Sequence, residues 1–244
     1  MNCDLHATAV AQRDGARACA ASVVAPAAAA IDRMATIPDD VRHAARAALP
    51  SRSPADVDPV AWVVALEELA VANAAVAIDA AGAQDARASG PQWPGLRGAD
   101  AGGLTSWLDA ASEGQLAVTA VLVGLGRAAV EQAEAALRTA GASGRPDAGG
   151  HSSLADAATL VDGARLLLWD ASRQGSESAR AMARLQAIEA VGAAVAAAER
   201  ATAAEASRPG APLERIARDA ATTVRVFGGA ANAQRAVAAA VLPD

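Results

Sequence analysis

Glu67 and Glu68 are the residues whose type most directly suggests chemistry, because paired carboxylates can serve as general acid and general base. They stand next to each other in a helix predicted from Pro59 to about Ala81, with Asp58 as its cap and with a buried stripe of Trp62, Leu66, Leu69 and Val76. Adjacent helix positions diverge by about 100° around the axis, so the two side chains cannot converge on one substrate atom. The sequence therefore predicts that both carboxylates lie on a solvated helix face.

Cysteine, histidine and glycine offer little further chemistry. Cys3 and Cys19 show no CxxC spacing and no nearby histidine pair, so we expect neither a disulfide framework nor a metal site. His151 is expected in a loop from Gly141 to His151, without a serine or cysteine nucleophile arranged around it. A dinucleotide-binding glycine loop directly follows a strand, and no strand is predicted before Gly124 and Gly126. We therefore expect these two glycines to allow two helices to approach closely.

The C-terminal stretch 212–235 has the most informative spacing. Apolar side chains recur every three or four residues and so share one helix face: Leu213, Ile216, Ala220, Val224 and Phe227. Pro212 suits the first turn of this helix, and the Gly228-Gly229 pair ends it. A short closing helix is predicted from Ala230 to Leu242.

The residue identities of this stretch resemble the C-terminal signature of the acyl-CoA dehydrogenase family. There, a helix carrying Arg-Asp-Ala leads to a Glu-Gly-Thr loop and then to a Gln-Arg helix. Arg218-Asp219-Ala220 matches the first part and Gln234-Arg235 matches the last, and the two matches align with the family signature without an insertion or deletion between them. The loop glutamate, which removes the proton next to the thioester in many members, corresponds to Gly228. The resemblance thus implies the family fold without its catalytic carboxylate at the matching place.

Further segments resemble the family along most of the chain. They are the Ala-Pro and Asp-Arg elements of 24–33, the Glu-Glu-Leu-Ala of 67–70, the helix segment 123–130, Leu154-Ala-Asp156 and Ala164-Arg-Leu166. The β domain that the family inserts between its helical parts has no counterpart here. The segment from Gly82 to Gly103 is too short for a sheet and lacks the alternation of a strand.

The resemblance implies FAD as a cofactor, with its loss as the alternative. Arg145, Gly229 and Gln234 are the candidate cofactor contacts. Ser143-Gly-Arg-Pro146 keeps part of the family's Arg-x-x-Phe-Gly loop pattern without the phenylalanine, and the family's Gly-Gly-x-Gly motif is replaced by Ala193–Glu199.

Glu113 is the candidate for a replacement base. Some family members place their glutamate on the first helix of the C-terminal bundle, and Glu113 lies near that region without matching its register. The simpler interpretation, which we favour, is an acid at a helix N-terminus, where it stabilises by about 0.3–1 kcal/mol.

Composition indicates an all-α protein. Alanine, the best helix former, dominates the 244 residues, while tyrosine is absent and phenylalanine occurs once. We expect N-terminal helices plus a C-terminal up-down four-helix bundle of acyl-CoA dehydrogenase type. The expected organisation is an N-terminal helical region (1–81), a linker replacing the β domain (82–103) and the helical bundle (104–244).

The formal net charge of −6, with arginines spread among acidic residues, argues against a nucleic-acid partner. The longest uncharged runs, such as Ala18–Ile31 and Gln115–Gly126, are too short to cross a bilayer, so we expect no membrane partner. No convincing signal peptide begins the sequence, and two isolated cysteines fit a reduced compartment. The predicted location is cytoplasmic.

Three hypotheses for function follow. The first is an acyl-CoA dehydrogenase-like oxidoreductase acting on CH-CH groups of an acyl-CoA, with weakened or lost catalysis. The alternative is a non-catalytic helical subunit that dimerises with itself or with an active, full-length acyl-CoA dehydrogenase. The third is a helical scaffold unrelated to flavoenzymes.

Overall fold

The computed structural model describes residues 4–50, 58–82, 95–99, 112–142, 148–202, 210–226 and 229–242. Within these ranges every regular element is a helix, and the one β-type contact is a bridge between Thr36 and Gly98. The predicted all-α fold is confirmed.

The N-terminal region opens with a long, nearly continuous helical run. It consists of α1 (Ala7–Cys19), a π-helical segment η1 (Ala20–Val24) and α2 (Ala25–Met34). Pro26 stands in the first turn of α2, directly after the π-helical segment. A wider turn is expected there because proline cannot donate a helix hydrogen bond. The left-handed Ala35 ends α2, and α3 (Asp39–Ala47) follows.

The helix predicted from Pro59 to Ala81 is two helices, so that prediction was wrong. They are α4 (Pro59–Ala72) and α5 (Ala74–Gly82). Asn73 separates them in an extended conformation, and its side-chain oxygen accepts a hydrogen bond from the Val76 amide at 3.1 Å. Asn73 thus caps a new helix instead of continuing the old one. The predicted cap at Asp58 is confirmed by its bond from the Val60 amide at 3.0 Å.

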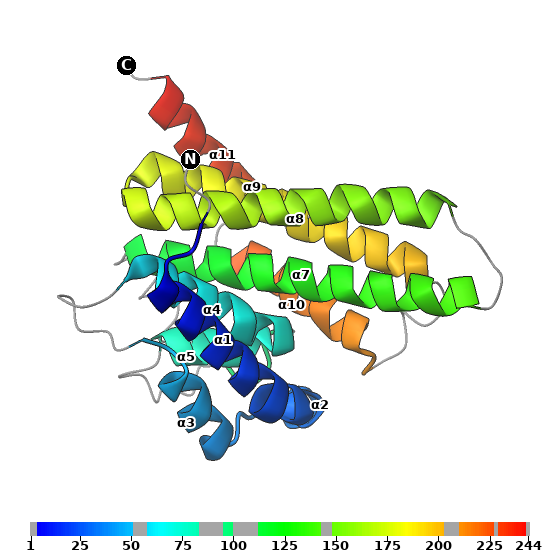
Figure 1. Cartoon of the computed structure of the whole chain (residues 1–244). Coiled ribbons are helices and arrows are strands. Elements are labelled where there is room, and N and C mark those ends of the chain that lie inside the picture. Colours follow the sequence, from blue (N-terminus) through cyan, green and yellow to red (C-terminus); the bar gives the residue numbers. More distant parts are fainter. Residues whose placement is uncertain are drawn as a thin grey trace.

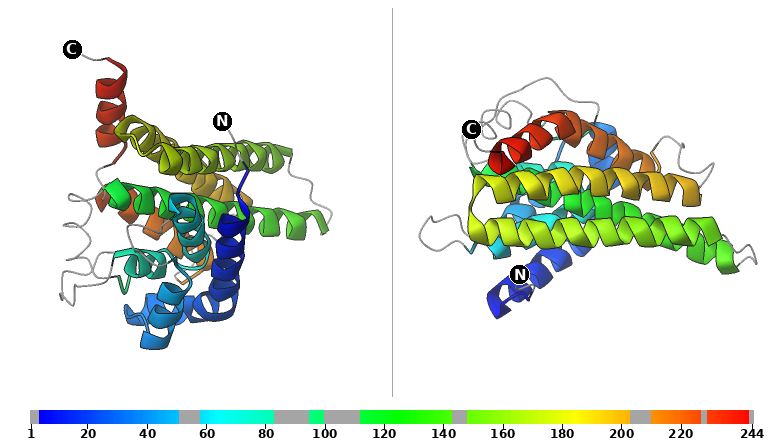
Figure 2. Two further views of the ribbon diagram at one scale, coloured as in Figure 1. Left: turned by 60° about the vertical axis from the view of Figure 1, so that its left-hand side comes forward. Right: turned by 90° about the horizontal axis from the view of Figure 1, so that it is seen from above.

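The C-terminal region is an up-down bundle of long helices. They are α7 (Ser112–Ala142), α8 (Ala148–Gln174), α9 (Glu177–Thr202) and α10 (Pro212–Val226), followed by α11 (Gly229–Val241). Figures 1 and 2 show α8 and α9 as one antiparallel layer, α7 and α10 as the next, and the N-terminal helices beneath. His151 lies inside α8, which begins at Ala148, so the prediction that the loop extends to His151 was wrong.

Helix α4 lies at the centre of this arrangement, between α1 and α7. Every residue from Val60 to Ala70 is buried, on all sides of the helix. The predicted apolar residues Trp62, Leu66 and Leu69 are therefore in the core, together with the residues between them. A helix that is apolar on all sides belongs inside a protein.

Two bundle helices, over Gly114–Thr139 and Glu177–Thr202, are long and apolar enough to span a membrane by length and composition alone. Both helices contain charged residues, so they do not contradict the expectation that the uncharged runs are too short. Within the bundle, 72% of the apolar 18-residue segment of the first helix is buried, and 44% of the corresponding segment of the second helix. Packing in a bundle core explains such composition, and these helices are weak support for a membrane span.

Candidate functional site

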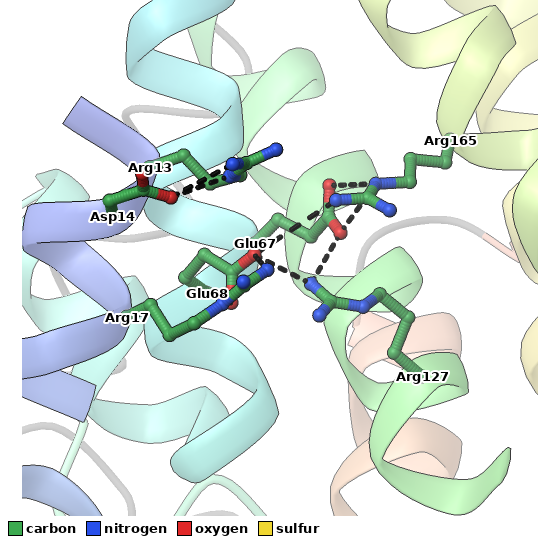
Figure 3. A network of polar contacts seen from close by, with 7 residues as sticks. All are labelled: Arg13, Asp14, Arg17, Glu67, Glu68, Arg127 and Arg165. Carbon is green, nitrogen blue, oxygen red and sulfur yellow. Dashed lines mark hydrogen bonds and ion pairs between the residues drawn. The ribbon is translucent and has the colours of Figure 1, made fainter. Parts of the chain in front are cut away.

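A network of charged side chains around two buried glutamates joins the N-terminal helices to the bundle (Figure 3). At its centre are Glu67 and Glu68 of α4, with 0% and 3% of their surfaces exposed. The guanidinium groups of three arginines surround them, from α1 (Arg17), α7 (Arg127) and α8 (Arg165). The prediction that the two glutamates lie on a solvated face was wrong.

Glu67 is held by the two bundle helices. Its Oε1 accepts a hydrogen bond from Arg127 Nη1 at 2.6 Å, and Arg165 Nε lies 2.9 Å from the same oxygen. The Glu67 Oε2 atom accepts from Arg165 Nε at 3.2 Å. Arg165 also lies over the ring of Trp169, 5.0 Å from its centroid, so the guanidinium is fixed from two sides.

Glu68 is held mainly from α1. Arg17 donates through Nε and Nη2 to the two carboxylate oxygens, at 3.1 and 2.8 Å, which is the strong bidentate geometry. Arg127 Nη1 also donates to Glu68 Oε1, at 3.1 Å. The adjacent carboxylates therefore converge on one guanidinium nitrogen, because the long arginine side chain reaches both across the α4–α7 contact.

The pKa values of the two carboxyl groups move in opposite directions. Burial raises the pKa of Glu67, and the charges of Arg165 and Arg127 oppose that rise. Burial also acts to raise the pKa of Glu68, but the hydrogen bond from Arg17 and the charge of Arg127 outweigh it, so the pKa is lowered. The difference follows from solvent access, since Glu67 is the more deeply enclosed of the two.

This geometry gives the network a structural role. Each of the four glutamate oxygens receives a hydrogen bond from an arginine, and both side chains are buried, so neither carboxylate is open to a substrate. A general base needs a free lone pair within reach of the proton that it removes. The network instead ties α1, α4, α7 and α8 together.

Gly124 of α7 allows the close contact that the network needs. A Cβ atom at this position would lie 2.6 Å from Ala70 Cβ and 2.7 Å from the Glu67 carbonyl oxygen, both on α4. At Gly126, a Cβ atom would lie 3.0 Å from Val161 of α8. The prediction that these two glycines allow close helix approach is confirmed.

A second polar cluster lies on α10, where the Arg-Asp-Ala motif is found. Arg218 pairs with Asp32 of α2, and its Nη1 donates to Glu214 at 2.6 Å. Asp219 is buried and accepts a hydrogen bond from the Leu96 amide at 2.7 Å. The predicted apolar face is also found, with Leu213, Ile216 and Ala220 buried and Val224 partly buried, while Phe227 lies outside the described residues.

The family model for "Acyl-CoA dehydrogenase, C-terminal domain" matches residues 101–242. This chain belongs to the acyl-CoA dehydrogenase family. The match includes α7 to α11 and the Arg-Asp-Ala motif, so the resemblance read from the sequence is confirmed. A search of curated protein sequences found no match.

Solved structures of the acyl-CoA dehydrogenase type have the same fold. The chain is similar to butyryl-CoA dehydrogenase from Megasphaera elsdenii, at 13% identity and a TM-score of 0.80, with 99% of this chain and 100% of that one covered. It is also similar to a glutaryl-CoA dehydrogenase from Mycobacterium smegmatis in complex with FADH2, at 10% identity and a TM-score of 0.78, covering 98% and 96%.

A third structure shows how widely this fold is used. Dibenzothiophene monooxygenase from Paenibacillus sp. A11-2 aligns at 14% identity with a TM-score of 0.68, covering 95% of this chain and 97% of that one. At such identities the likeness establishes the fold alone, so the reaction has to be argued from residues.

The structure describes only some of the site residues predicted for an acyl-CoA dehydrogenase. Arg145 and Gly228 lie outside the described residues. Glu113 is in the first turn of α7, and its side chain is likewise outside the described part. Gly229 begins α11, and Gln234 lies one turn further along that helix with its side chain exposed. The described residues therefore place two of the predicted contacts on one helix.

The arginines of the buried network were missed by the sequence reasoning. A usable signal was present, because the 14 residues of α4 contain no charged residue other than Glu67 and Glu68. A helix so apolar is enclosed, so its two carboxylates require cationic partners from the helices around it.

Proposed function

We propose that this chain is an acyl-CoA dehydrogenase-like flavoprotein of the oxidoreductase class that acts on CH-CH groups, with weakened or lost turnover. The observation that carries the proposal is that α10 retains the family's Arg-Asp-Ala signature, while the position of the catalytic glutamate is occupied by glycine. Arg218 and Asp219 keep α10 attached to α2 and to residues 95–99, while the position of the loop glutamate is Gly228.

When bound, FAD would supply the hydride acceptor for the β-carbon of the acyl chain. Gly229 and Gln234 would contact it, together with Arg145. A Cβ atom at Gly229 would meet nothing within 4 Å, and α11 has no acidic residue in its first turn. An open helix start without carboxylates suits a phosphate-bearing cofactor, and the exposed Gln234 amide can donate to it. These features support the cofactor assignment.

The proposal of weak turnover rests on which carboxylates could act as the general base. The Glu67–Glu68 pair is buried and held by arginines, so it does not replace the missing carboxylate. Glu113 stays the candidate replacement, by its position at the start of α7. Loss of a general base costs about 10²–10⁴-fold in rate, so slow turnover is the expected outcome.

The test is a measurement of flavin content and flavin reduction. The purified chain is reconstituted with FAD, desalted, and its absorbance spectrum is recorded before and after addition of an acyl-CoA under anaerobic conditions. We expect retained FAD and slow bleaching, with Glu113→Gln slowing it further if Glu113 is the base. A protein that retains no FAD at any concentration tested overturns the proposal.

A non-catalytic partner subunit is the second candidate function, and the outer surface of α8 and α9 favours it. Gly163 and Gly192 lie inside these long helices, although a Cβ atom at either position would meet nothing within 4 Å. Glycine inside a helix costs about 1 kcal/mol relative to alanine. Leu167, Ile188 and Val195 on the same two helices are only partly buried. A second helical subunit packed there would explain both features.

Light scattering on the full chain tests this second candidate. We expect a dimer that Gly192→Leu dissociates, with the matched change Gly15→Leu on the exposed face of α1 leaving the dimer intact. Co-purification with a full-length acyl-CoA dehydrogenase would support the mixed assembly. A monomer at every concentration, without capture of such a partner, would refute it. We also propose a cytoplasmic location, which fractionation would test.

A further inference from the structure

Residues 95–99 form a short turn wedged between α10 and the connection from α2 to α3. The Leu96 amide donates to Asp219 Oδ1 at 2.7 Å, and the Gly95 amide donates to Thr222 Oγ1 at 3.0 Å. At Gly95, a Cβ atom would lie 2.5 Å from Thr222 Oγ1 and 2.6 Å from the Arg218 carbonyl oxygen. Only glycine fits against α10 at this point.

The turn is strained at its buried leucine. Leu96 has a φ of +55°, a left-handed conformation that costs a non-glycine residue energy. Its side chain is nonetheless buried, and the Ala99 amide donates to the Leu96 carbonyl at 3.0 Å to close the turn. A strained conformation persists only where its surroundings hold it, and here Asp219 binds the amide of the strained residue.

The far side of the turn is attached to the N-terminal helices. Gly98 forms a parallel bridge with Thr36, and Arg97 Nη1 donates to the Asp32 carbonyl at 3.3 Å. The Asp32 carboxylate in turn pairs with Arg218 of α10. Residues 95–99 therefore connect parts of the chain that lie more than 100 residues apart.

Asp219 is a buried carboxylate on the inner side of this turn, with 3% of its surface exposed. The largest electrostatic influences on it come from Arg218 and Arg215 of α10 and from Asp32 of α2, and none of the charged residues of α7 or α9 is among them. Burial raises the pKa of Asp219 to about 6, although the Leu96 amide and the two arginines act to lower it. The carboxyl thus ionises within the ordinary laboratory pH range.

We propose that residues 95–99 are a pH-sensitive latch between α10 and the α2–α3 connection, with Asp219 as its holding group. The latch is closed most firmly when Asp219 is neutral, because the neutral carboxyl still accepts the Leu96 amide through its carbonyl oxygen without a buried charge. When the carboxyl is ionised, opening brings water to the charge and relieves the strain at Leu96.

The sign of the pH effect follows from linkage. The pKa of the Asp219 carboxyl is about 6 in the closed state and 3.8 when it is solvated. The carboxyl therefore stabilises the closed state fully below pH 3.8, and this stabilisation is lost as the pH rises through 6. With those two values, the equilibrium constant for opening rises about tenfold between pH 5 and pH 8. This inference does not depend on flavin binding or on turnover.

Hydrogen exchange on the full chain tests the latch. Protection of the Leu96 amide, corrected for the intrinsic exchange rate, is measured from pH 5 to pH 8. We expect about a tenfold loss of protection in the wild-type protein across this range. Asp219→Asn, which keeps an acceptor oxygen and removes the charge, should show no such trend. The exposed change Asp156→Asn on α8 serves as the control and should behave like the wild type.

Thr222→Ala supplies a second test that leaves Asp219 in place. It removes the acceptor of the Gly95 amide, so we expect faster opening at every pH with the same slope. A wild-type protein whose Leu96 protection is constant between pH 5 and pH 8 overturns the proposal, whether or not the Asp219→Asn protein folds. An unchanged slope in Asp219→Asn overturns it equally.

Discussion

The Nη1 atom of Arg127 lies 2.6 Å from the Glu67 carboxylate, at the centre of the contact between α4 and α7 (Figure 3). The same nitrogen lies 3.1 Å from Glu68, so one guanidinium bridges two consecutive residues of a buried helix. Because Arg17 and Arg165 complete the set, the N-terminal helices and the bundle are joined through two buried carboxylates and the arginines around them. This arrangement leads to the first three predictions.

Arg127→Met should destabilise the protein by about 3–5 kcal/mol, since it removes one partner of a buried carboxylate and leaves Glu67 undercompensated. Urea denaturation followed by circular dichroism measures the change. The control is Arg138→Met, which removes an exposed pair with Glu134 on the same helix and should cost less than about 1 kcal/mol. If the methionine variant does not fold, Arg127→Lys should give a smaller loss. Equal stability of Arg127→Met and Arg138→Met would contradict a structural role for the network.

Glu68→Gln should change how the free energy of unfolding depends on pH. Arg17 and Arg127 hold the pKa of Glu68 below its ordinary value of 4.5, despite its burial. The stability that this gives is present above pH 4.5 and is lost as the pH falls through the lower folded value. The difference in unfolding free energy between wild type and variant should therefore shrink from pH 6 towards pH 3. Glu189→Gln, an exposed change on α9, should show no such trend, and a constant difference for Glu68→Gln would argue against the ion pair.

Gly124→Ala should destabilise the protein by about 1–3 kcal/mol, although alanine is the better helix former. The added Cβ would lie 2.6 Å from Ala70 and force α4 and α7 apart. Gly15→Ala on exposed α1, where a Cβ meets nothing within 4 Å, should instead stabilise by about 0.5–1 kcal/mol. Thermal unfolding of the two variants compares them directly. Stabilisation by Gly124→Ala would show that the α4–α7 contact is looser than described.

Gly228→Glu should restore a carboxylate at the family's base position. With FAD bound, we expect the rate of flavin reduction by an acyl-CoA to rise by about 10²–10⁴-fold, the usual contribution of a general base. Stopped-flow absorbance measures that rate, and Gly15→Glu controls for the added charge. An unchanged rate in a protein that retains FAD would indicate that the missing carboxylate is not what limits turnover.

Much of the helical layout could be predicted from the sequence, because its signals are local. Capping by Asp58, the first-turn Pro212 and the apolar spacing of Leu213, Ile216 and Ala220 depend only on neighbouring residues, and the structure confirms them. The break at Asn73 escaped prediction, since an asparagine side chain can either continue a helix surface or cap the next helix. The close packing at Gly124 was predicted from residue type alone, without its partner helix.

What the sequence determined by itself was the family, the helical class and the missing carboxylate at Gly228, since these depend on residue identity and spacing. Only the tertiary structure decided the environment of the charged residues. Glu67 and Glu68 are 59 or more residues from Arg127 and about 50 from Arg17, and only packing of α4 against α1 and α7 makes them neighbours. The same holds for Asp219 and Leu96. Solvation depends on everything that surrounds a side chain, and local sequence does not contain that information.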